Sequence, residues 1–244
     1  MAMGATAWRL GRDASSDLHR KPPVAPSAII LRSSKLVPSM VLLLLGLAFA
    51  AAIENGALLT IWDEPIQRAV EAARTPTMNA VMTVITELGD KFVIIGLVGL
   101  SLPFVWRRCH SLAFVMAAAT VARPLLEFTL KSMADRPRPD LERLLPGNGP
   151  SFPSGHVLAA IALWGLLPPV VALFTNKKTW WWASVAFSGF LIAAISASRV
   201  YLGVHWFSDV IGGLLVGALY LVGVERLLAW RHKHHGCSTD EALT

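Results

Sequence analysis

Apolar and polar residues occur along this chain in long blocks rather than in short alternation. Six blocks are almost wholly apolar, at 37–53, 91–106, 111–130, 156–174, 180–197 and 207–230. A helix needs about 20 predominantly apolar residues to cross the hydrocarbon core of a bilayer. The pattern therefore predicts an all-α membrane protein with six transmembrane helices.

The stretch 54–90, between the first two blocks, has a different pattern. Apolar residues recur there at helical intervals, in one series that starts at Trp62 and another that starts at Met78. Asp63-Glu64-Pro65 resembles the start of a helix. Two interpretations fit equally well: two short amphipathic helices lying at the outer membrane interface, or an ordinary loop.

The two ends of the chain are polar. Residues 1–36 are basic and contain several prolines, which predicts a disordered cytoplasmic tail, and 231–244 form a second cytoplasmic tail. Ala48-Phe49-Ala50 resembles a signal-peptidase site, so the first apolar block is either a cleaved signal peptide or an anchor helix. The basic region before it is too long for a typical signal, which favours an uncleaved anchor.

Basic clusters predict the orientation of the six helices. Arg107-Arg108, Lys177-Lys178 and the cluster at 231–235 all fall on the same side as the N-terminal tail. Cytoplasmic segments carry an excess of Lys and Arg. We therefore expect both termini in the cytoplasm, and 54–90, 131–155 and 198–206 on the outer side of a bacterial inner membrane or a plasma membrane.

Composition agrees with a membrane protein. Apolar residues make up 54% of the chain and charged residues only 16%, against about 45–50% and about 25% in soluble domains. The net charge of +6 lies in the short clusters between apolar blocks, which argues against a nucleic-acid partner. Cys109 and Cys237 have no metal-like spacing, and both fall on the predicted cytoplasmic side, so we expect no structural disulfide.

Charged residues interrupt the third apolar block. Arg123, Glu127 and Lys131 are spaced by four and so lie on one face of a helix. Ionisable groups within a membrane span face the bundle interior and pair with one another. We expect Glu127 to pair with Arg123 or Lys131.

Three segments on the predicted outer side carry groups suited to binding an anion. The first runs from Lys131 to Pro139, the second from Ser151 to His156, directly before the fourth block, and the third from Ser198 to Asp209. Ser154 is a natural N-cap, and the N–H groups behind it form an anion site at a helix N-terminus. His205 and Asp209 lie one helical turn apart, so the carboxylate can orient and stabilise the imidazole.

Each of these groups has an ordinary structural explanation when it is taken alone. Lys131 could be a snorkelling anchor, Ser154 a simple cap and His205 an interfacial residue. Together they supply three cations, a helix N-terminus, two histidines and an aspartate. Phosphoryl transfer depends on such positioning and charge stabilisation. One histidine could attack phosphorus while the other protonates the leaving oxygen, but the residues do not show which one attacks.

The spacing of these groups resembles a known signature. Lys131 with Arg138-Pro139, Pro153-Ser-Gly-His156, and Ser198-Arg199 with His205 and Asp209 are similar, in order and spacing, to the three motifs of the type 2 phosphatidic acid phosphatase superfamily. That superfamily also contains soluble acid phosphatases and vanadium haloperoxidases. Six spans with the site at the outer interface indicate the membrane-integral lipid phosphate phosphatase branch.

The resemblance implies a role for each motif residue. His205 would be the nucleophile that forms a phosphohistidine, Asp209 would orient it, and His156 would be the general acid. The phosphoryl oxygens would be bound by Lys131, Arg138, Ser154, Gly155 and Arg199. Arg136 lies outside the strict pattern and is expected to have only a supporting electrostatic role. No carboxylate cluster has metal-binding spacing, so we expect neither a metal nor another cofactor.

The function implied is hydrolysis of a lipid phosphate or diphosphate, in which the lipid tail lies between helices. Polyprenyl diphosphate, phosphatidic acid and phosphatidylglycerol phosphate all fit, and recycling of a polyprenyl diphosphate carrier in the cell envelope is the leading expectation. The alternatives are a lipid-linked phosphotransferase that uses the same site and a catalytically silent membrane protein. The retained charged set argues against the last.

Overall fold

A computed structural model describes residues 46, 48–49, 58–140, 142–175 and 177–237. These residues are helical or lie in turns and loops, and no strand occurs among them. In chain order the elements are the π-helix η2 (Leu59–Asp63), α3 (Glu64–Ala72), α4 (Pro76–Glu87), α5 (Lys91–Trp106), α6 (His110–Ala134), α7 (Gly155–Trp164), α8 (Leu167–Phe174), α9 (Lys178–Tyr201) and α10 (Phe207–His235). The all-α prediction is confirmed for this part of the chain.

Four helical spans in the described part are long and apolar enough to cross a membrane: α6, α7 with α8, α9 and α10. A fifth arises if α4 and α5, which meet at a bend of 46°, count as one span. The predicted tail at 1–36 and the predicted first span at 37–53 lie outside the described residues, apart from 46, 48 and 49. The prediction of a membrane-integral protein is confirmed, and the number six stays a prediction.

The stretch between the first two apolar blocks is helical. η2, α3 and α4 occupy most of 59–87, so the helical interpretation is correct and the loop interpretation is wrong. Thr75 caps α4 by accepting a hydrogen bond from Met78 N–H at 3.2 Å. The placement of these helices at a membrane interface stays a prediction.

Helix α7 lies at the centre of the bundle, in contact with α5, α6, α9 and α10. Its residues from Val157 to Ala160 are buried. The closest neighbour is α10: a Cβ at Gly213 would lie 3.2 Å from the Cβ of Val157, and one at Gly217 would overlap the side chain of Ile161. The two glycines on α10, Gly213 and Gly217, therefore allow α7 and α10 to pack closely.

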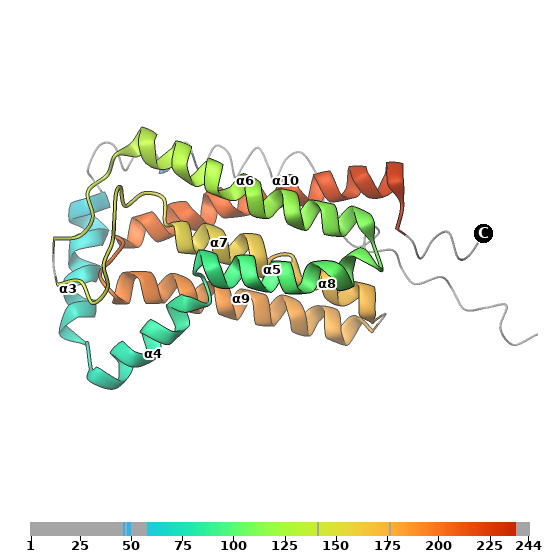
Figure 1. Cartoon of the computed structure of the whole chain (residues 1–244). Helices are drawn as coiled ribbons and strands as arrows, with labels where there is room; N and C mark the ends of the chain where they lie inside the picture. The colour runs from blue at the N-terminus through green and yellow to red at the C-terminus, as the bar shows by residue number, and fades with distance from the viewer. Residues whose placement is uncertain (1–45, 47, 50–57, 141, 176, 238–244) are drawn as a thin grey trace, which may run out of the picture.

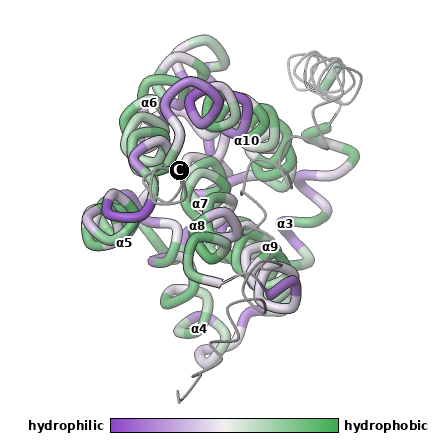
Figure 2. The backbone as a smooth tube through the Cα atoms, turned by 90° about the vertical axis from the view of Figure 1, so that its right-hand side faces the viewer, coloured by the Kyte–Doolittle hydropathy of each residue, from purple (hydrophilic) through white to green (hydrophobic). Residues whose placement is uncertain are grey.

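The long helices run between two ends of the bundle (Figure 1). At one end, here called the site end, lie α3, the C-terminus of α6, the N-terminus of α7 and the loop between them. At the other, the cysteine end, lie the N-terminus of α6 and the C-terminus of α10. Hydrophobic residues make up much of the long helices (Figure 2), as expected of helices in lipid.

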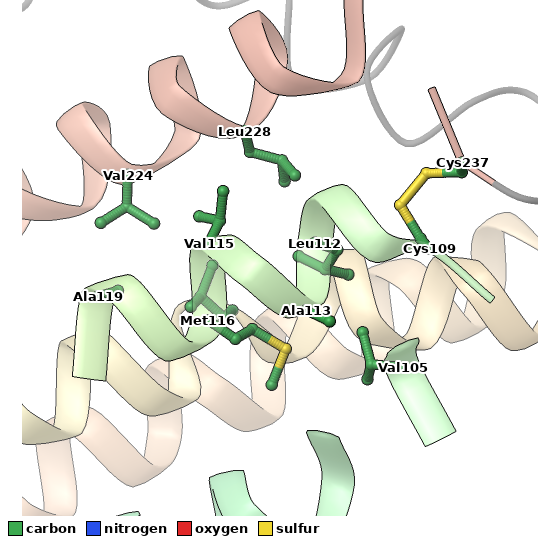
Figure 3. Packing of buried hydrophobic residues seen from close by; sticks show 11 residues of the cluster. Val105, Cys109, Leu112, Ala113, Val115, Met116, Ala119, Val224, Leu228 and Cys237 are labelled. Atoms are coloured by element: carbon green, nitrogen blue, oxygen red, sulfur yellow. A yellow bond between two sulfur atoms is a disulfide. The ribbon is translucent and has the colours of Figure 1, made fainter. Parts of the chain in front are cut away.

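The cysteine end is built on an apolar cluster between α5, α6, α8 and α10 (Figure 3). Its fully buried members are Val105, Cys109, Leu112, Ala113, Val115, Met116, Ala119, Leu166, Val224, Leu228 and Cys237. α10 continues to His235, so the first residues of the predicted C-terminal tail are helical. Residues 238–244 lie outside the described part.

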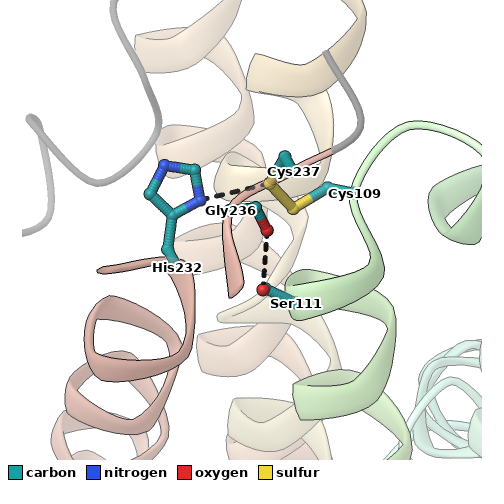
Figure 4. Close-up of a disulfide and its surroundings, with 5 residues drawn as sticks. All are labelled: Cys109, Ser111, His232, Gly236 and Cys237. Atoms are coloured by element: carbon teal, nitrogen blue, oxygen red, sulfur yellow. Dashed lines mark hydrogen bonds between the residues drawn. A yellow bond between two sulfur atoms is a disulfide. The ribbon is translucent and has the colours of Figure 1, made fainter. Parts of the chain in front are cut away.

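A disulfide joins Cys109 to Cys237 at this end (Figure 4), so the expectation of no structural disulfide is wrong. The two cysteines are 128 residues apart in sequence, but α6 begins where α10 ends. His232 lies beside them, with its Nδ1 3.1 Å from Cys237 Sγ. Fold proximity, which sequence spacing does not reveal, therefore brings together three groups of metal-ligating type.

Candidate active site

A cavity of about 400 Å³ opens at the site end. The segments that line it are far apart in sequence: the turn between α4 and α5, the second half of α6, the loop after α6, the start of α7, the end of α9 and His205. Six predicted site residues line the cavity: Lys131, Arg138, Gly155, His156, Arg199 and His205. The other two, Ser154 and Asp209, are buried behind its wall. The structure thus brings all three motifs to one place.

His205 follows α9 and precedes α10, and it is buried. Its Nδ1 lies 3.6 Å from Asp209 Oδ2, which is near enough for charge attraction but too long for a hydrogen bond. Its Nε2 lies 3.4 Å from Arg138 Nη1. Asp209 lies beside Nδ1 and favours the tautomer that has its proton on Nδ1. Nε2 then carries a lone pair that is available for attack.

The pKa of His205 is lowered to about 4, chiefly because the imidazole is buried; Asp209 opposes this shift, and the charges of Arg199 and Arg138 contribute to it. The imidazole is therefore neutral at physiological pH. A neutral imidazole is the form that can act as a nucleophile.

Asp209 is held by partners on both of its oxygens. Oδ2 accepts a hydrogen bond from Trp206 N–H at 2.9 Å, and Oδ1 accepts one from Arg136 Nη1 at 2.5 Å. Its backbone carbonyl also accepts from Ser154 N–H at 3.2 Å. The second and third motifs are therefore joined directly, through the residue that stands behind His205.

Arg138 is fixed by backbone carbonyls of the loop after α6. Its Nε donates to Gly149 O at 3.0 Å, and its Nη2 donates to Asn148 O at 2.9 Å. Nη1 donates to Val204 O at 2.6 Å and faces His205. Because most of its donors are already engaged, a bound phosphate would meet this guanidinium chiefly at Nη1, beside Nε2 of His205.

The N-terminus of α7 lies against Glu127. A Cβ built on Gly155 would overlap the Glu127 carboxylate, so only glycine fits there while Glu127 is in this position. Ser154 precedes the helix, but its hydroxyl is buried with no hydrogen-bond partner among the described residues. The hydroxyl therefore does not cap the helix.

Arg199 reaches the cavity from the last turn of α9. Its Nη1 donates to Thr86 Oγ1 of α4 at 2.6 Å, and its buried Nε has no partner within the described part of the chain. An unpaired donor of a buried guanidinium is costly unless a ligand completes it. Arg199 is therefore aimed at an anion in the cavity.

The charged ladder on α6 forms the third wall. Glu127 pairs with Arg123 at 2.6 Å and with Lys131 at 3.2 Å, so the predicted pairing is confirmed for both partners. All three residues line the cavity. The ladder therefore belongs to the site as well as to the helix packing.

Sequence reasoning missed several residues around the site. Asp63, Ser208 and Thr86 are all buried. Asp63 and Ser208 each accept a hydrogen bond from Arg136, and Thr86 accepts one from Arg199. Asp63 and Thr86 come from helices distant in sequence, so spacing carries no signal for them. In the sequence, Asp63 stood out only as part of Asp63-Glu64-Pro65, a possible helix start.

Bundle and cavity together define a membrane-integral protein with an oxyanion site at one end. The model of the PAP2 superfamily matches residues 105–233, and the chain belongs to that superfamily. Asp63 and Thr86 lie upstream of the matched residues.

Two curated relatives and one solved structure are similar to this chain over most of their length. Phosphatidylglycerophosphatase B of Bacillus subtilis is 35% identical over 186 residues, covering 73% of this chain and 88% of the relative. The undecaprenyl-diphosphatase of Sulfolobus acidocaldarius is 30% identical, covering 58% and 66%. The crystal structure of a transmembrane PAP2-type phosphatidylglycerolphosphate phosphatase from Bacillus subtilis matches with a TM-score of 0.66 and 31% identity, covering 77% of this chain and 94% of that one. The chain is therefore a lipid phosphate phosphatase of the membrane.

Proposed function

We propose that this enzyme hydrolyses a lipid phosphate or diphosphate through a phosphohistidine on His205, at the extracytoplasmic face of the membrane. The observation that carries the proposal is the convergence of six motif residues on one cavity. Two of them are imidazoles and three are cations, which is the set that an in-line phosphoryl transfer needs.

The first half of the reaction transfers the phosphoryl group to the enzyme. Nε2 of His205 attacks phosphorus, the bond from phosphorus to the leaving oxygen breaks, and His156 gives that oxygen a proton. Asp209 stabilises the positive charge that develops on the His205 ring. Lys131, Arg138 and Arg199 bind the phosphoryl oxygens, with the N–H of Gly155 and the hydroxyl of Ser154.

The second half returns the enzyme to its starting state. Water attacks the phosphohistidine, the phosphorus–nitrogen bond breaks, and His156 takes a proton from the water. Orthophosphate leaves, and His205 is again neutral.

Acid-stable and base-stable phosphoenzymes can be told apart, which makes the intermediate testable. Solubilised enzyme is quenched in base after mixing with a ³²P-labelled lipid phosphate, because phosphohistidine survives base and is lost in acid. We expect label on the wild-type chain and none on His205→Ala. Label on His205→Ala at the wild-type level would overturn the assignment of the nucleophile.

The location of the site follows from the charges at the two ends. Arg107, Arg108 and Lys177 belong to the turns of the cysteine end, and cytoplasmic segments are enriched in such residues. The site end then faces outward. A water-soluble, membrane-impermeant phosphate ester should be cleaved by intact right-side-out vesicles; cleavage only by inverted vesicles would reverse the orientation.

The substrate is a lipid with a small phosphorylated headgroup. Phosphatidylglycerol phosphate is favoured by the Bacillus subtilis relative, and a polyprenyl diphosphate by the Sulfolobus acidocaldarius relative. A panel of these two lipids and phosphatidic acid, at equal detergent mole fraction, ranks them by kcat/KM. Phosphate release that requires an added acceptor would instead favour a phosphotransferase.

A further inference from the structure

We propose that Asp63 is a positioning residue for phosphoryl transfer, acting through Arg136 and Ser208 on Asp209. The inference rests on the proposed function, because it assigns Asp63 to the support of the nucleophile His205. It adds a residue from η2, which the motif pattern does not reach.

Asp63 is the last residue of η2 and is completely buried. Both of its oxygens are engaged. Oδ1 accepts the backbone N–H of Ser208 at 2.8 Å, while Oδ2 accepts the Ser208 hydroxyl at 2.6 Å and Arg136 Nη2 at 2.7 Å. A buried carboxylate that accepts hydrogen bonds from three donor atoms on two other segments is held in one position.

Arg136 bridges two buried carboxylates. Its Nη2 pairs with Asp63, and its Nη1 donates to Asp209 Oδ1 at 2.5 Å and to Ser208 Oγ at 2.7 Å. The guanidinium therefore takes one oxygen of Asp209 and leaves the other, Oδ2, facing Nδ1 of His205. This division fixes the rotation of the Asp209 carboxylate.

The charges give Asp63 a second effect. Asp63, Arg136 and Asp209 together carry a net charge of −1, which balances the positive charge on His205 when its ring becomes phosphorylated. If Asp63 were neutral, Arg136 would cancel the charge of Asp209, and the phosphorylated ring would lose that stabilisation. Asp63 therefore keeps Asp209 effective as the partner of His205.

A purely structural role is the competing explanation, because Asp63 also ties η2 to the start of α10. The two roles differ in what they change. Asp63 does not line the cavity, so a positioning role lowers kcat and leaves the binding of phosphate unaltered. A structural role lowers the amount of folded enzyme, or loosens the cavity and raises the inhibition constant of orthophosphate.

The test compares Asp63→Asn in two backgrounds. In the wild-type background we expect kcat to fall by roughly 10- to 100-fold, with KM and the inhibition constant of orthophosphate within about twofold. In an Asp209→Asn background, where the carboxylate that Asp63 supports is already gone, the same change should cost less than about threefold. An equal loss in both backgrounds, or an unchanged kcat in the wild-type background, would overturn the proposal.

Two controls separate a structural effect. Ile66→Ala removes an apolar side chain that packs α3 against the core next to α10 without touching the carboxylates, so it reports what loosening this helix alone does. Glu64→Gln changes the charge of the neighbouring exposed residue. Both should keep kcat within about threefold, and a loss in Ile66→Ala as large as in Asp63→Asn would reject the positioning role.

The base-stable phosphoenzyme distinguishes this proposal from the function on which it rests. If the wild type traps label on His205 and Asp63→Asn traps it at the same rate, the inference about Asp63 fails and the function stands. If the wild type traps no label on His205, the proposed mechanism fails.

Discussion

The two ends of the bundle are held together by different forces. At the site end, segments distant in sequence meet through charged hydrogen bonds, such as those that join Asp63, Arg136 and Asp209. At the cysteine end, the same long helices meet through an apolar cluster and one covalent bond. Buried charge contributes little net stability, because desolvation offsets the attraction, whereas apolar packing contributes directly.

The two halves of α6 differ in the same way as the two ends of the bundle. Its first half contributes residues to the cluster of the cysteine end, and its second half carries three charged residues into the cavity: Leu112, Ala113, Val115, Met116 and Ala119 belong to the first set and Arg123, Glu127 and Lys131 to the second. Substitutions at the site end should therefore change the reaction more than the stability, and substitutions at the cysteine end should do the reverse. Four experiments test this division, starting with the largest expected effect.

His156→Ala should lower turnover of a lipid phosphate by about 10²- to 10⁴-fold, the usual contribution of a general acid. Its melting temperature in detergent should stay within a few degrees of the wild type. The rate of phosphoenzyme formation should fall much less with p-nitrophenyl phosphate, because a nitrophenolate leaves without a proton, whereas the later attack of water needs His156 with either substrate. An equal fall in the rate of phosphoenzyme formation with both substrates would remove His156 from the role of acid.

Leu112→Ala should show the opposite pattern. Leu112 is 1% exposed at the cysteine end, and truncation of a buried leucine costs about 2–5 kcal/mol. We expect a clear fall in melting temperature with kcat/KM of the remaining folded enzyme unchanged. Leu125→Ala, on the same helix but 67% exposed, is the matched control and should melt like the wild type; equal melting temperatures for the two variants would contradict the division.

Cys237→Ser should also destabilise the cysteine end without changing the reaction. A cross-link over a long loop contributes about 2–4 kcal/mol, but helices confined by a membrane leave less chain entropy to remove, so we expect about 1–2 kcal/mol. Thermal denaturation with and without a reductant measures it, since a reductant should lower the melting temperature of the wild type and leave Cys237→Ser unchanged. A variant with normal stability and impaired turnover would show that this end communicates with the site.

The same contrast explains what could be predicted from the sequence. Long apolar blocks predict the helices α5, α6, α9 and α10, because a run of apolar side chains of this length is typical of a helix in a membrane. The motif residues were found because their order and spacing resemble the signature of the superfamily, and their residue types are those that bind and transfer a phosphoryl group. The pair at Glu127 was found because its partners are one turn away on the same helix.

Contacts between distant segments left no such trace. Asp63 and Arg136 are 73 residues apart, and Cys109 and Cys237 are 128 apart; nothing local in the sequence marks either pair. The disulfide was rejected on a compartment rule, which says nothing about whether α6 begins beside the end of α10. Both contacts depend on how the helices pack in three dimensions, which a single sequence does not show.

Glu127→Gln should have the smallest effect of the four variants. Whether it strengthens or weakens inhibition by orthophosphate shows what Glu127 does in the cavity. The carboxylate lies at the N-terminus of α7, where a Cβ on Gly155 would overlap it, and it pairs with both Arg123 and Lys131. It thus occupies, with a negative charge, part of the cavity where phosphate would bind. Its removal frees both cations, so orthophosphate should inhibit about three- to fivefold more strongly, as expected for one partly exposed ion pair.

The opposite sign would give Glu127 a different role. If its main effect is to hold Lys131 in place, Glu127→Gln should weaken inhibition by orthophosphate. Glu64→Gln is the matched control, because Glu64 also pairs with an arginine four residues away, at 2.9 Å, but on the exposed surface of α3. Since Glu64 lies outside the cavity, Glu64→Gln should leave inhibition by orthophosphate unchanged. Any change in inhibition that it does cause is subtracted from the change measured for Glu127→Gln.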